Sequence, residues 1–245
     1  MNYNQDLKDY KLDFLEEKGW LVKESPHYKF YYFPDTLAEQ DISKIQNSQE
    51  KAFEKIVDFL EVNIPNQKIK YYLYPDLEIK ERLMGNRWYG QSIYSELRIH
   101  ILYTEQVKPV GEHEDTHLLS LPWGISIGFF QEGLAEFMSG HAWDGQNHRV
   151  YVRGGYQRDI FPAISEYMDH KTWMDINDEK AIFFYSLAGA FVSFIIKEYG
   201  KDKFKVFYKQ SNRKNSKGQN KEYFISIYGK EISDVEREFK QDLDV

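Results

Sequence analysis

The chain has 245 residues, which is long enough for one domain of two lobes, or for two small domains, with a sizeable core. Its 39 acidic and 32 basic residues give a net charge near −7, so neither nucleic acid nor an anionic membrane is an expected partner. The absence of cysteine excludes disulfides, thiol nucleophiles and thiolate metal sites, which leaves histidines and carboxylates as metal ligands.

The distribution of apolar residues predicts no membrane span. The first twenty residues carry several charges and do not resemble a signal peptide, and no segment approaches 18 apolar residues. We therefore expect a soluble protein, cytoplasmic as the sequence is written and extracytoplasmic if a signal peptide has been removed before Asn2. The oligomeric state is left open.

The first half of the chain has the pattern of an α+β lobe. After a polar lead-in, residues 1–26, a helix is predicted from Thr36, which forms a capping box with Glu39, to Leu60, with apolar residues at helical spacing. A loop rich in glycine separates the last two of three predicted strands. These strands are the runs 27–33, 68–74 and 97–103.

From Gly111 onward the pattern changes to helices, predicted over 112–121, 129–139, 181–199 and 233–243. The last one opens with a capping box, Ser233 and Glu236. The basic run 209–221 is interleaved with Ser, Asn and Gly and is predicted to be a solvated loop. The prediction is one domain of class α+β over residues 1–245, with an α+β lobe at 27–121 and a helical lobe at 122–245.

Residues 113–117 carry the strongest chemical signal, because they read His-Glu-Asp-Thr-His within a predicted helix. Residues four apart project from one helical face, so His113 and His117 can bind one Zn²⁺ while Glu114 flanks a water. Zinc would lower the pKa of that water, and the carboxylate would accept its proton. The alternative is a surface helix with two solvated histidines.

A third ligand must come from elsewhere, and the surrounding residues exclude two classes of H-E-x-x-H enzyme. A cysteine ligand is impossible, and a metzincin would need Gly and His where Ser120 and Trp123 stand. Glu132 on the next helix is well placed, and the turn at 122–124 brings this helix back beside the first. Gly133 costs about 1 kcal/mol relative to Ala in a helix, which favours close helix packing at a site.

Glu136 lies one turn beyond Glu132 on the same face of the predicted helix. It either accepts the second ring N–H of a ligand histidine or is a solvent-facing carboxylate.

The H-E-x-x-H motif followed by Glu132-Gly-Leu-Ala-Glu136-Phe resembles the peptidase MA-like gluzincins, which are distant relatives of thermolysin. The segment 185–200, with a tyrosine before Ala-Gly-Ala-Phe-Val and a Tyr-Gly end, resembles a later helix of that family. The tail 228–233 before the last helix also fits. The likeness covers roughly residues 27–243 and is strongest at 110–140 and 181–200.

This resemblance implies a zincin-like, two-lobe metallopeptidase with one Zn²⁺ per chain. It implies His113, His117 and Glu132 as ligands, Glu114 as the base, and Tyr185 as donor to the oxyanion. It also implies that the strand at 97–103 is the edge along which an extended substrate pairs. Tyr185 has an alternative as a core aromatic side chain.

Two histidines outside the motif and one missing segment limit what the resemblance implies. His100 is expected to be a solvated strand residue, and His141, just past the Glu132 helix, is not assigned. The Gly-x-Met-Glu-Asn segment with which related aminopeptidases hold a free N-terminus is absent, so exopeptidase action is not implied.

The predicted function is zinc-dependent hydrolysis of peptide bonds in a peptide or protein substrate, with Glu114 activating the water. One alternative keeps the zinc in a non-catalytic binding or sensor domain. The second alternative is a metal-free interaction domain. The substrate and the cleavage preference are not predicted.

Overall fold

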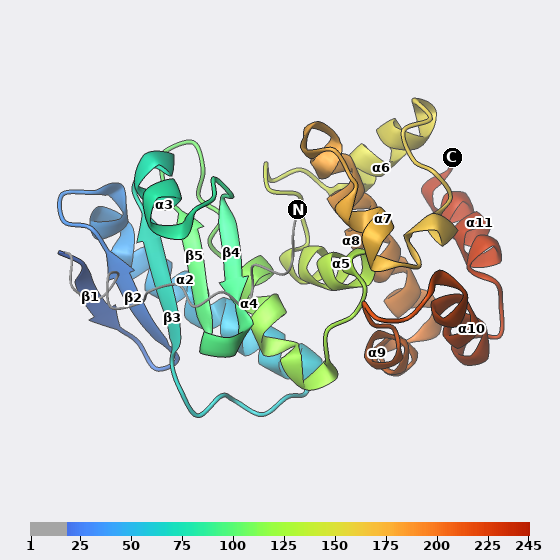
Figure 1. Cartoon of the computed structure of the whole chain (residues 1–245), viewed down its shortest axis with the longest axis horizontal. Helices are drawn as coiled ribbons and strands as arrows, with labels where there is room; N and C mark the ends of the chain where they lie inside the picture. The colour runs from blue at the N-terminus through green and yellow to red at the C-terminus, as the bar shows by residue number, and fades with distance from the viewer. Residues whose placement is uncertain (1–18) are drawn as a thin grey trace. The chain divides into compact units, whose positions relative to one another are not determined.

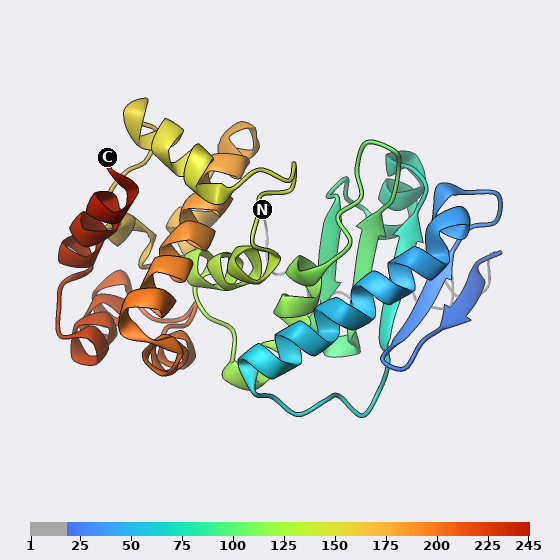
Figure 2. The same ribbon diagram turned by 180° about the vertical axis from the view of Figure 1, so that it is seen from behind.

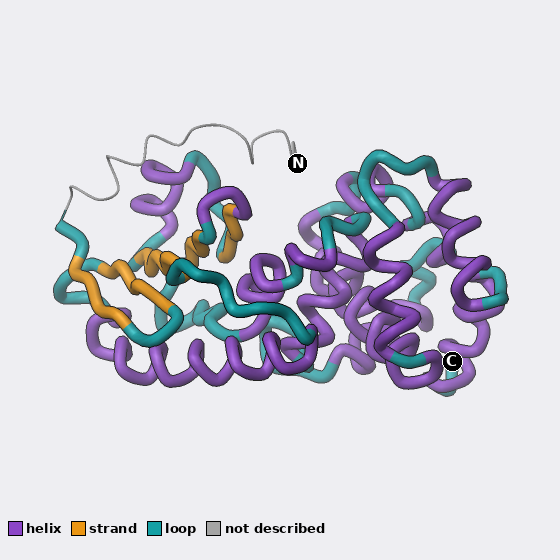
Figure 3. Tube along the Cα trace, turned by 90° about the horizontal axis from the view of Figure 1, so that it is seen from below, coloured by secondary structure: helices purple, strands orange, loops and turns teal. Residues whose placement is uncertain are grey.

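The computed structural model of the chain describes residues 19–245, which divide into two compact units between Ser120 and Leu121. Within the described residues, all strands lie in the unit 19–120, whereas the unit 121–245 is helical (Figures 1 and 3). The predicted α+β class is confirmed, since a five-stranded mixed sheet with helices is followed by a mostly helical region.

The sheet has the strand order β1-β2-β3-β5-β4 (Figure 1). Strands β2, β3 and β5 are parallel, while β1 and β4 are antiparallel to their neighbours β2 and β5. The four-residue strands β1 and β4 were not predicted, because one lies in the expected lead-in and the other in the expected loop. The strands are β1 Leu21–Glu24, β2 Tyr28–Tyr32, β3 Ile69–Tyr74, β4 Gly90–Ile93 and β5 Arg98–Leu102.

One face of the sheet is covered by α2 (Leu37–Leu60), which connects β2 to β3, and by α4 (Glu112–Leu119), which packs on α2 (Figure 2). The buried residues of α2 recur every three or four positions, as the sequence predicted. Thr36 is the N-cap, but the predicted capping box is wrong. Its hydroxyl donates to the Phe33 carbonyl at 2.7 Å, and Glu39 accepts from the Asp35 N–H at 2.7 Å.

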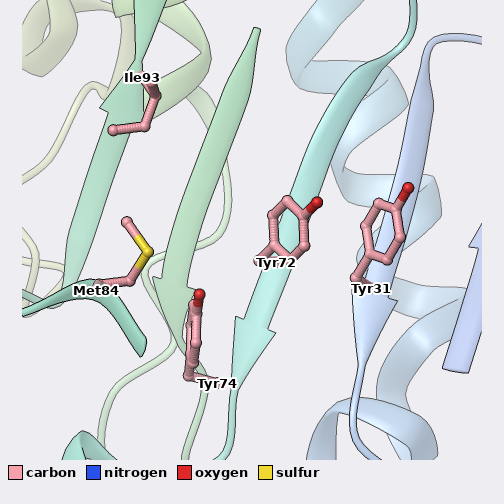
Figure 4. Packing of buried hydrophobic residues seen from close by; sticks show 5 residues of the cluster. All are labelled: Tyr31, Tyr72, Tyr74, Met84 and Ile93. Atoms are coloured by element: carbon pink, nitrogen blue, oxygen red, sulfur yellow. The ribbon is translucent and has the colours of Figure 1, made fainter. Parts of the chain in front are cut away.

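The opposite face carries an aromatic cluster under α3 (Leu77–Met84), a helix that was not predicted (Figure 4). Asp76 caps this helix by accepting from the Ile79 N–H at 2.7 Å. The rings of Tyr31 and Tyr72 stack with centroids 4.5 Å apart on neighbouring strands. The cluster consists of Tyr31, Tyr72, Tyr74, Met84 and Ile93, with Trp20, Ile79 and Leu83 packed against it.

The unit 121–245 is built around α8, which packs against α5, α6 and α9. The predicted helices at 129–139, 181–199 and 233–243 are present within one residue of their expected ends. The α-helices of this unit are α5 Gly128–Ser139, α6 His148–Gln157, α7 His170–Met174, α8 Ala181–Tyr199, α9 Lys201–Gln210, α10 Lys217–Tyr228 and α11 Ile232–Leu243.

Helix α8 has an unusually apolar composition. The stretch Asp178–Tyr199 has a mean hydropathy of 1.5 and is long enough to cross a membrane, so the expectation of no such segment is wrong. More than half of it, 56%, is buried, because its side chains fill the core between the surrounding helices. A buried core helix can be as long and as apolar as a membrane span. Helix α8 is therefore consistent with a soluble protein.

Two further expectations for the helical unit are wrong. The basic run 209–221 is not one loop, because it contains the end of α9 and the start of α10. A complete capping box opens α10, where Ser216 and Gln219 exchange hydrogen bonds. The box expected at Ser233 is absent, because α11 begins at Ile232 and Glu236 accepts instead from the Ile164 N–H at 2.8 Å.

Candidate metal centre

The H-E-x-x-H segment forms α4, and its two imidazoles lie on one face of that helix. The helix begins after Gly111, whose φ of 134° suits glycine, and has three carboxylates in its first turn, where they complement the helix dipole. His113 Nε2 and His117 Nε2 are 3.3 Å apart, with the rings nearly perpendicular at 85°. His117 is buried, so the alternative of a surface helix with two solvated histidines is wrong.

The separation of these nitrogens fits a shared metal ion. Two nitrogens bound to zinc at about 2.0–2.1 Å with a tetrahedral angle would lie roughly 3.3–3.4 Å apart. The observed 3.3 Å matches that value with the ring orientations present. Imidazole nitrogens at this spacing suit zinc as well as other first-row metals, so the pair by itself indicates a metal site without identifying the ion.

Glu114 is held by β4, the strand that packs beside α4. The Ser92 hydroxyl donates to Glu114 Oε2 at 2.6 Å and also lies 3.0 Å from the Glu114 main-chain oxygen. The other carboxylate oxygen lies over Gly90, where a Cβ atom would come within 2.3 Å of Oε1. The glycine and the serine of one short strand therefore define where this carboxylate sits.

The buried side of α4 is anchored by polar contacts to α2. Asp115 is fully buried and accepts a short hydrogen bond from the Gln49 amide, which also donates to the Gly111 carbonyl at 3.2 Å. Burial raises the pKa of Asp115 well above its ordinary value. These contacts fix the rotation of α4 about its axis and thereby the direction in which its histidines point.

The strand expected to form the sheet edge is internal. Strand β5 is flanked by β3 on one side and by β4 on the other, so the prediction that 97–103 is the edge is wrong. The edge on the side of α4 is β4. A strand of four residues that follows a glycine-containing loop shows too little alternation to be recognised in the sequence.

His100 in β5 is buried, so the expectation of a solvated residue is also wrong. Its Nδ1 is 2.9 Å from the Tyr74 hydroxyl, and its ring stacks on Tyr72 with centroids 4.8 Å apart. Burial, with the nearby charges of Lys80 and Arg98, holds the pKa of His100 well below its usual value. It lies on the face opposite α2 and belongs to the aromatic packing there.

In the helical unit, Glu132 lies on α5, which packs closely against α8. A Cβ atom at Gly133 would come within 2.6 Å of Val192 Cγ2 and 2.7 Å of the Ala188 carbonyl oxygen. The close helix packing inferred from this glycine is thus present. Glu132 itself is 5% exposed, which is unusual for a carboxylate unless it has polar or metal partners.

The start of α5 is surrounded by groups that the sequence did not single out. His170 Nδ1 accepts a hydrogen bond from the Gly128 N–H at 3.1 Å. Burial, followed by the charge of Arg213, lowers the pKa of His170 to about 4, while the charge of Glu132 opposes that shift. Arg213 donates to Gln131 at 2.7 Å. Neutral His170 can therefore serve as an acceptor at the helix terminus.

Glu136 is 3% exposed, which excludes the alternative of a solvent-facing carboxylate. The residue beside it is His148, at the start of α6, whose Nε2 is 3.4 Å from Glu136 Oε2 and 3.1 Å from the Glu136 carbonyl oxygen. His148 was not recognised in the sequence, because an isolated histidine at a helix start carries no spacing signal.

Tyr185 is half-buried on α8, between a buried phenylalanine and a buried serine. The centroid of its ring lies 5.9 Å from that of Trp143, which is 56% exposed, and 5.3 Å from that of Trp173. His141 is exposed and bonds only locally, with Nδ1 2.9 Å from the Ala142 carbonyl. Tyr185 therefore sits where an aromatic surface meets solvent within its unit.

The residues that could hold a metal ion are His113, His117 and Glu132. Two imidazoles and a carboxylate are a common donor set for catalytic zinc. No family model matches the chain, and no curated protein matches it. The functional argument therefore depends on the geometry of these side chains and on the chemistry of their donor atoms.

Proposed function

We propose that this protein is a zinc-dependent hydrolase of peptide bonds, in which His113, His117 and Glu132 hold one Zn²⁺ and Glu114 is the general base. The observation that carries the proposal is the 3.3 Å separation of the two Nε2 atoms on α4, which matches two nitrogens on one tetrahedral ion. The residue after His113 is Glu114, whose carboxylate accepts a hydrogen bond from Ser92.

The chain's own residues have separate tasks in this proposal. A bound zinc ion would polarise the scissile carbonyl and lower the pKa of an attacking water. Glu114 accepts the proton of that water and passes it to the leaving amine. Ser92 donates to one oxygen of Glu114, so the other oxygen is the one that handles the proton. Tyr185 donates its hydroxyl hydrogen to the oxygen that gains negative charge.

An extended peptide is the substrate that β4 favours. An edge strand offers main-chain groups that pair with any peptide irrespective of its side chains, which suits a peptidase. Gly90 brings this edge next to Glu114, since no Cβ atom stands between strand and carboxylate. A peptide paired with β4 would thus run past the general base.

The proposal is tested first by elemental analysis of purified protein. We expect one zinc per chain in the wild type, and loss of tight binding in Glu132→Ala. A wild type without stoichiometric zinc, or a Glu132→Ala variant that binds it equally tightly, contradicts the ligand assignment.

Turnover is tested next with a peptide library. Glu114→Gln should keep its zinc and lower turnover by about 10² to 10⁴, because an amide cannot accept the proton. Glu112→Gln is the matched control, since it removes a carboxylate from the same turn of α4 and should cleave at a near wild-type rate. A zinc-loaded wild type that cleaves nothing would favour the non-catalytic binding domain instead.

A further inference from the structure

The loop between α3 and β4 is built around the amide of Asn86, which has four hydrogen-bond partners. Its Oδ1 accepts from the Lys80 ammonium group at 3.0 Å and from the Trp88 N–H at 3.1 Å. Its Nδ2 donates to the Met84 carbonyl at 3.3 Å and to Gln91 Oε1 at 2.8 Å. The two acceptor sites and the two donors of this amide are therefore all used.

The partners determine which way the Asn86 amide faces. An ammonium group and a main-chain N–H can only donate, so Oδ1 must lie next to them. A carbonyl oxygen can only accept, so Nδ2 must lie next to Met84, and Gln91 meets the same nitrogen through its own oxygen. The hydrogen bonds therefore run in one direction, from Lys80 through Asn86 to Gln91.

This series of hydrogen bonds begins at a charge that is costly to bury. Lys80 is fully buried on α3, and burial lowers its pKa to about 8. An apolar side chain of similar length would fill the same volume without that cost. Departures of this kind from the usual pattern of buried residues are expected at functional sites.

The two faces of β4 have different partners. Gly90 and Ser92 lie against Glu114. Gln91 stands between them and faces the other way, because successive side chains of a strand point to opposite sides. It is paired with His100 of β5, whose ring packs on the face of the sheet away from α2. The loop amide therefore holds β4 from the side opposite Glu114.

The place of β4 in the sheet makes such support important. In the described part of the chain, β4 is an edge strand of four residues that pairs with β5 alone. Few main-chain hydrogen bonds can therefore fix it, and the Gln91 side chain adds a bond within the strand. A shift of β4 would move Gly90 and Ser92 together, and with them the surroundings of the Glu114 carboxylate.

We propose that Gln91 is a positioning residue, which holds β4 in the place where Ser92 orients the general base Glu114. The inference rests on the proposed function. Asn86 acts through Gln91, and the buried ammonium group of Lys80 keeps the Asn86 amide in the orientation that donates to it. None of these three side chains touches a substrate in this role.

The test compares two side chains of similar length at position 91. Gln91→Met deletes the oxygen that accepts from Asn86, whereas Gln91→Glu keeps an oxygen in the same place. Neither change alters a proposed metal ligand, so the zinc content should equal that of the wild type. Turnover is measured with the peptide library, and hydrogen exchange of residues 89–93 is measured on the metal-free proteins by mass spectrometry.

We expect Gln91→Met to lower turnover about tenfold and to speed the exchange of the β4 amides about tenfold, whereas Gln91→Glu should stay within about threefold of the wild type in both. In a Ser92→Ala background, Gln91→Met should cause no further loss of turnover, because both residues act on Glu114 through one strand. Equal results for Gln91→Met and Gln91→Glu, or additive losses of turnover in the double variant, would overturn the positioning role.

The wild-type arm separates this inference from the function on which it rests. A wild type that cleaves no peptide refutes the proposed function and the inference together. An active wild type with unchanged turnover in Gln91→Met refutes the inference alone. Melting temperatures identify a merely structural role, in which Gln91→Met lowers stability and leaves turnover unchanged.

Discussion

The two units hold their candidate metal ligands by different physical means. In the unit 19–120, the short helix α4 is fixed by hydrogen bonds, from Gln49 to Asp115 and from Ser92 to Glu114. In the unit 121–245, α5 is fixed mainly by shape, because Gly133 and Gly189 let α5 and α8 approach more closely than side chains would allow. The helix α4 depends on polar partners, whereas α5 combines close packing with polar contacts from His148, His170 and Arg213.

This difference determines what each unit tolerates. A helix held by buried hydrogen bonds is sensitive to the loss of a donor or to a change of protonation, because an unpaired buried polar group is costly. Close packing itself adds no dependence on pH, but it makes a helix sensitive to a single added methyl group. A variant that removes a polar partner therefore probes the unit 19–120, and one that adds a methyl group probes the unit 121–245. In each case the other unit serves as the reference.

Among the variants that compare the two units, the largest effect is expected for Tyr185→Phe in the helical unit. This change keeps the ring between Trp143 and Trp173 and deletes only the hydroxyl, so a catalytic donor should be lost without loss of packing. Turnover should fall by about 10² to 10³, or roughly 2.7 to 4 kcal/mol, with little change in KM. Steady-state kinetics check this, with Tyr223→Phe on the surface of the same unit as the control. Unchanged turnover would mean that Tyr185 is a core aromatic side chain without a catalytic role.

The second prediction concerns Lys80, a fully buried residue of the unit 19–120 whose ammonium group donates to Asn86 at 3.0 Å. Burial lowers the pKa of Lys80 from 10.5 to about 8, although the charge of Glu114 opposes the shift. Between those values the unfolded chain holds a proton that the folded chain has lost. The free energy of unfolding of the wild type should therefore rise with pH across this window.

Lys80→Met removes this dependence. Relative to the variant, the wild type should gain about 2 to 3 kcal/mol between pH 7 and pH 10, because the buried charge destabilises the fold fully below pH 8. Urea denaturation of both proteins at the two pH values gives the difference. Buried tyrosines such as Tyr71 have a raised pKa, which lowers the free energy of unfolding as the pH rises above 10. They are present in both proteins, so their effect cancels in the difference. A pH-independent difference would contradict the prediction.

A smaller effect is expected when one methyl group is added between α5 and α8. Gly133→Ala should lower the free energy of unfolding by about 1 to 3 kcal/mol, because backbone atoms of α8 stand where the methyl would go. Gly154→Ala on α6 is the matched control, since its nearest neighbour is the end of the Arg158 side chain at 3.5 Å. That variant should be neutral or stabilised by up to about 1 kcal/mol. Equal effects of the two variants would show that close packing does not hold α5.

The smallest effect is expected for Ser92→Ala, which removes the donor to Glu114. Turnover should fall about tenfold, because the carboxylate loses one orienting hydrogen bond while zinc binding is retained. Kinetics at saturating substrate measure the effect. Ser43→Ala is the control, since Ser43 is an exposed serine of the same unit that accepts only from Lys23. A variant as active as the control would mean that β4 does not position the base.

Features that depend on local geometry could be predicted from the order of the residues alone. The helical period places His113 and His117 on one face of α4 whatever surrounds them. The apolar spacing of α2 and the alternating strands likewise follow from residues close together in the chain, so the α+β class was predictable. Gly133 signalled close helix packing because its helical cost needed a compensating contact.

Which distant residues support these helices could not be predicted before the chain was folded. Ser92 meets Glu114 across 22 positions, Gln49 meets Asp115 across 66, and His148 meets Glu136 across 12. No periodic pattern connects such pairs, because each contact depends on where a strand or a neighbouring helix packs. The same reason explains why β4 is the sheet edge, why His100 is buried, and why Glu236 binds the Ile164 N–H instead of capping its own helix.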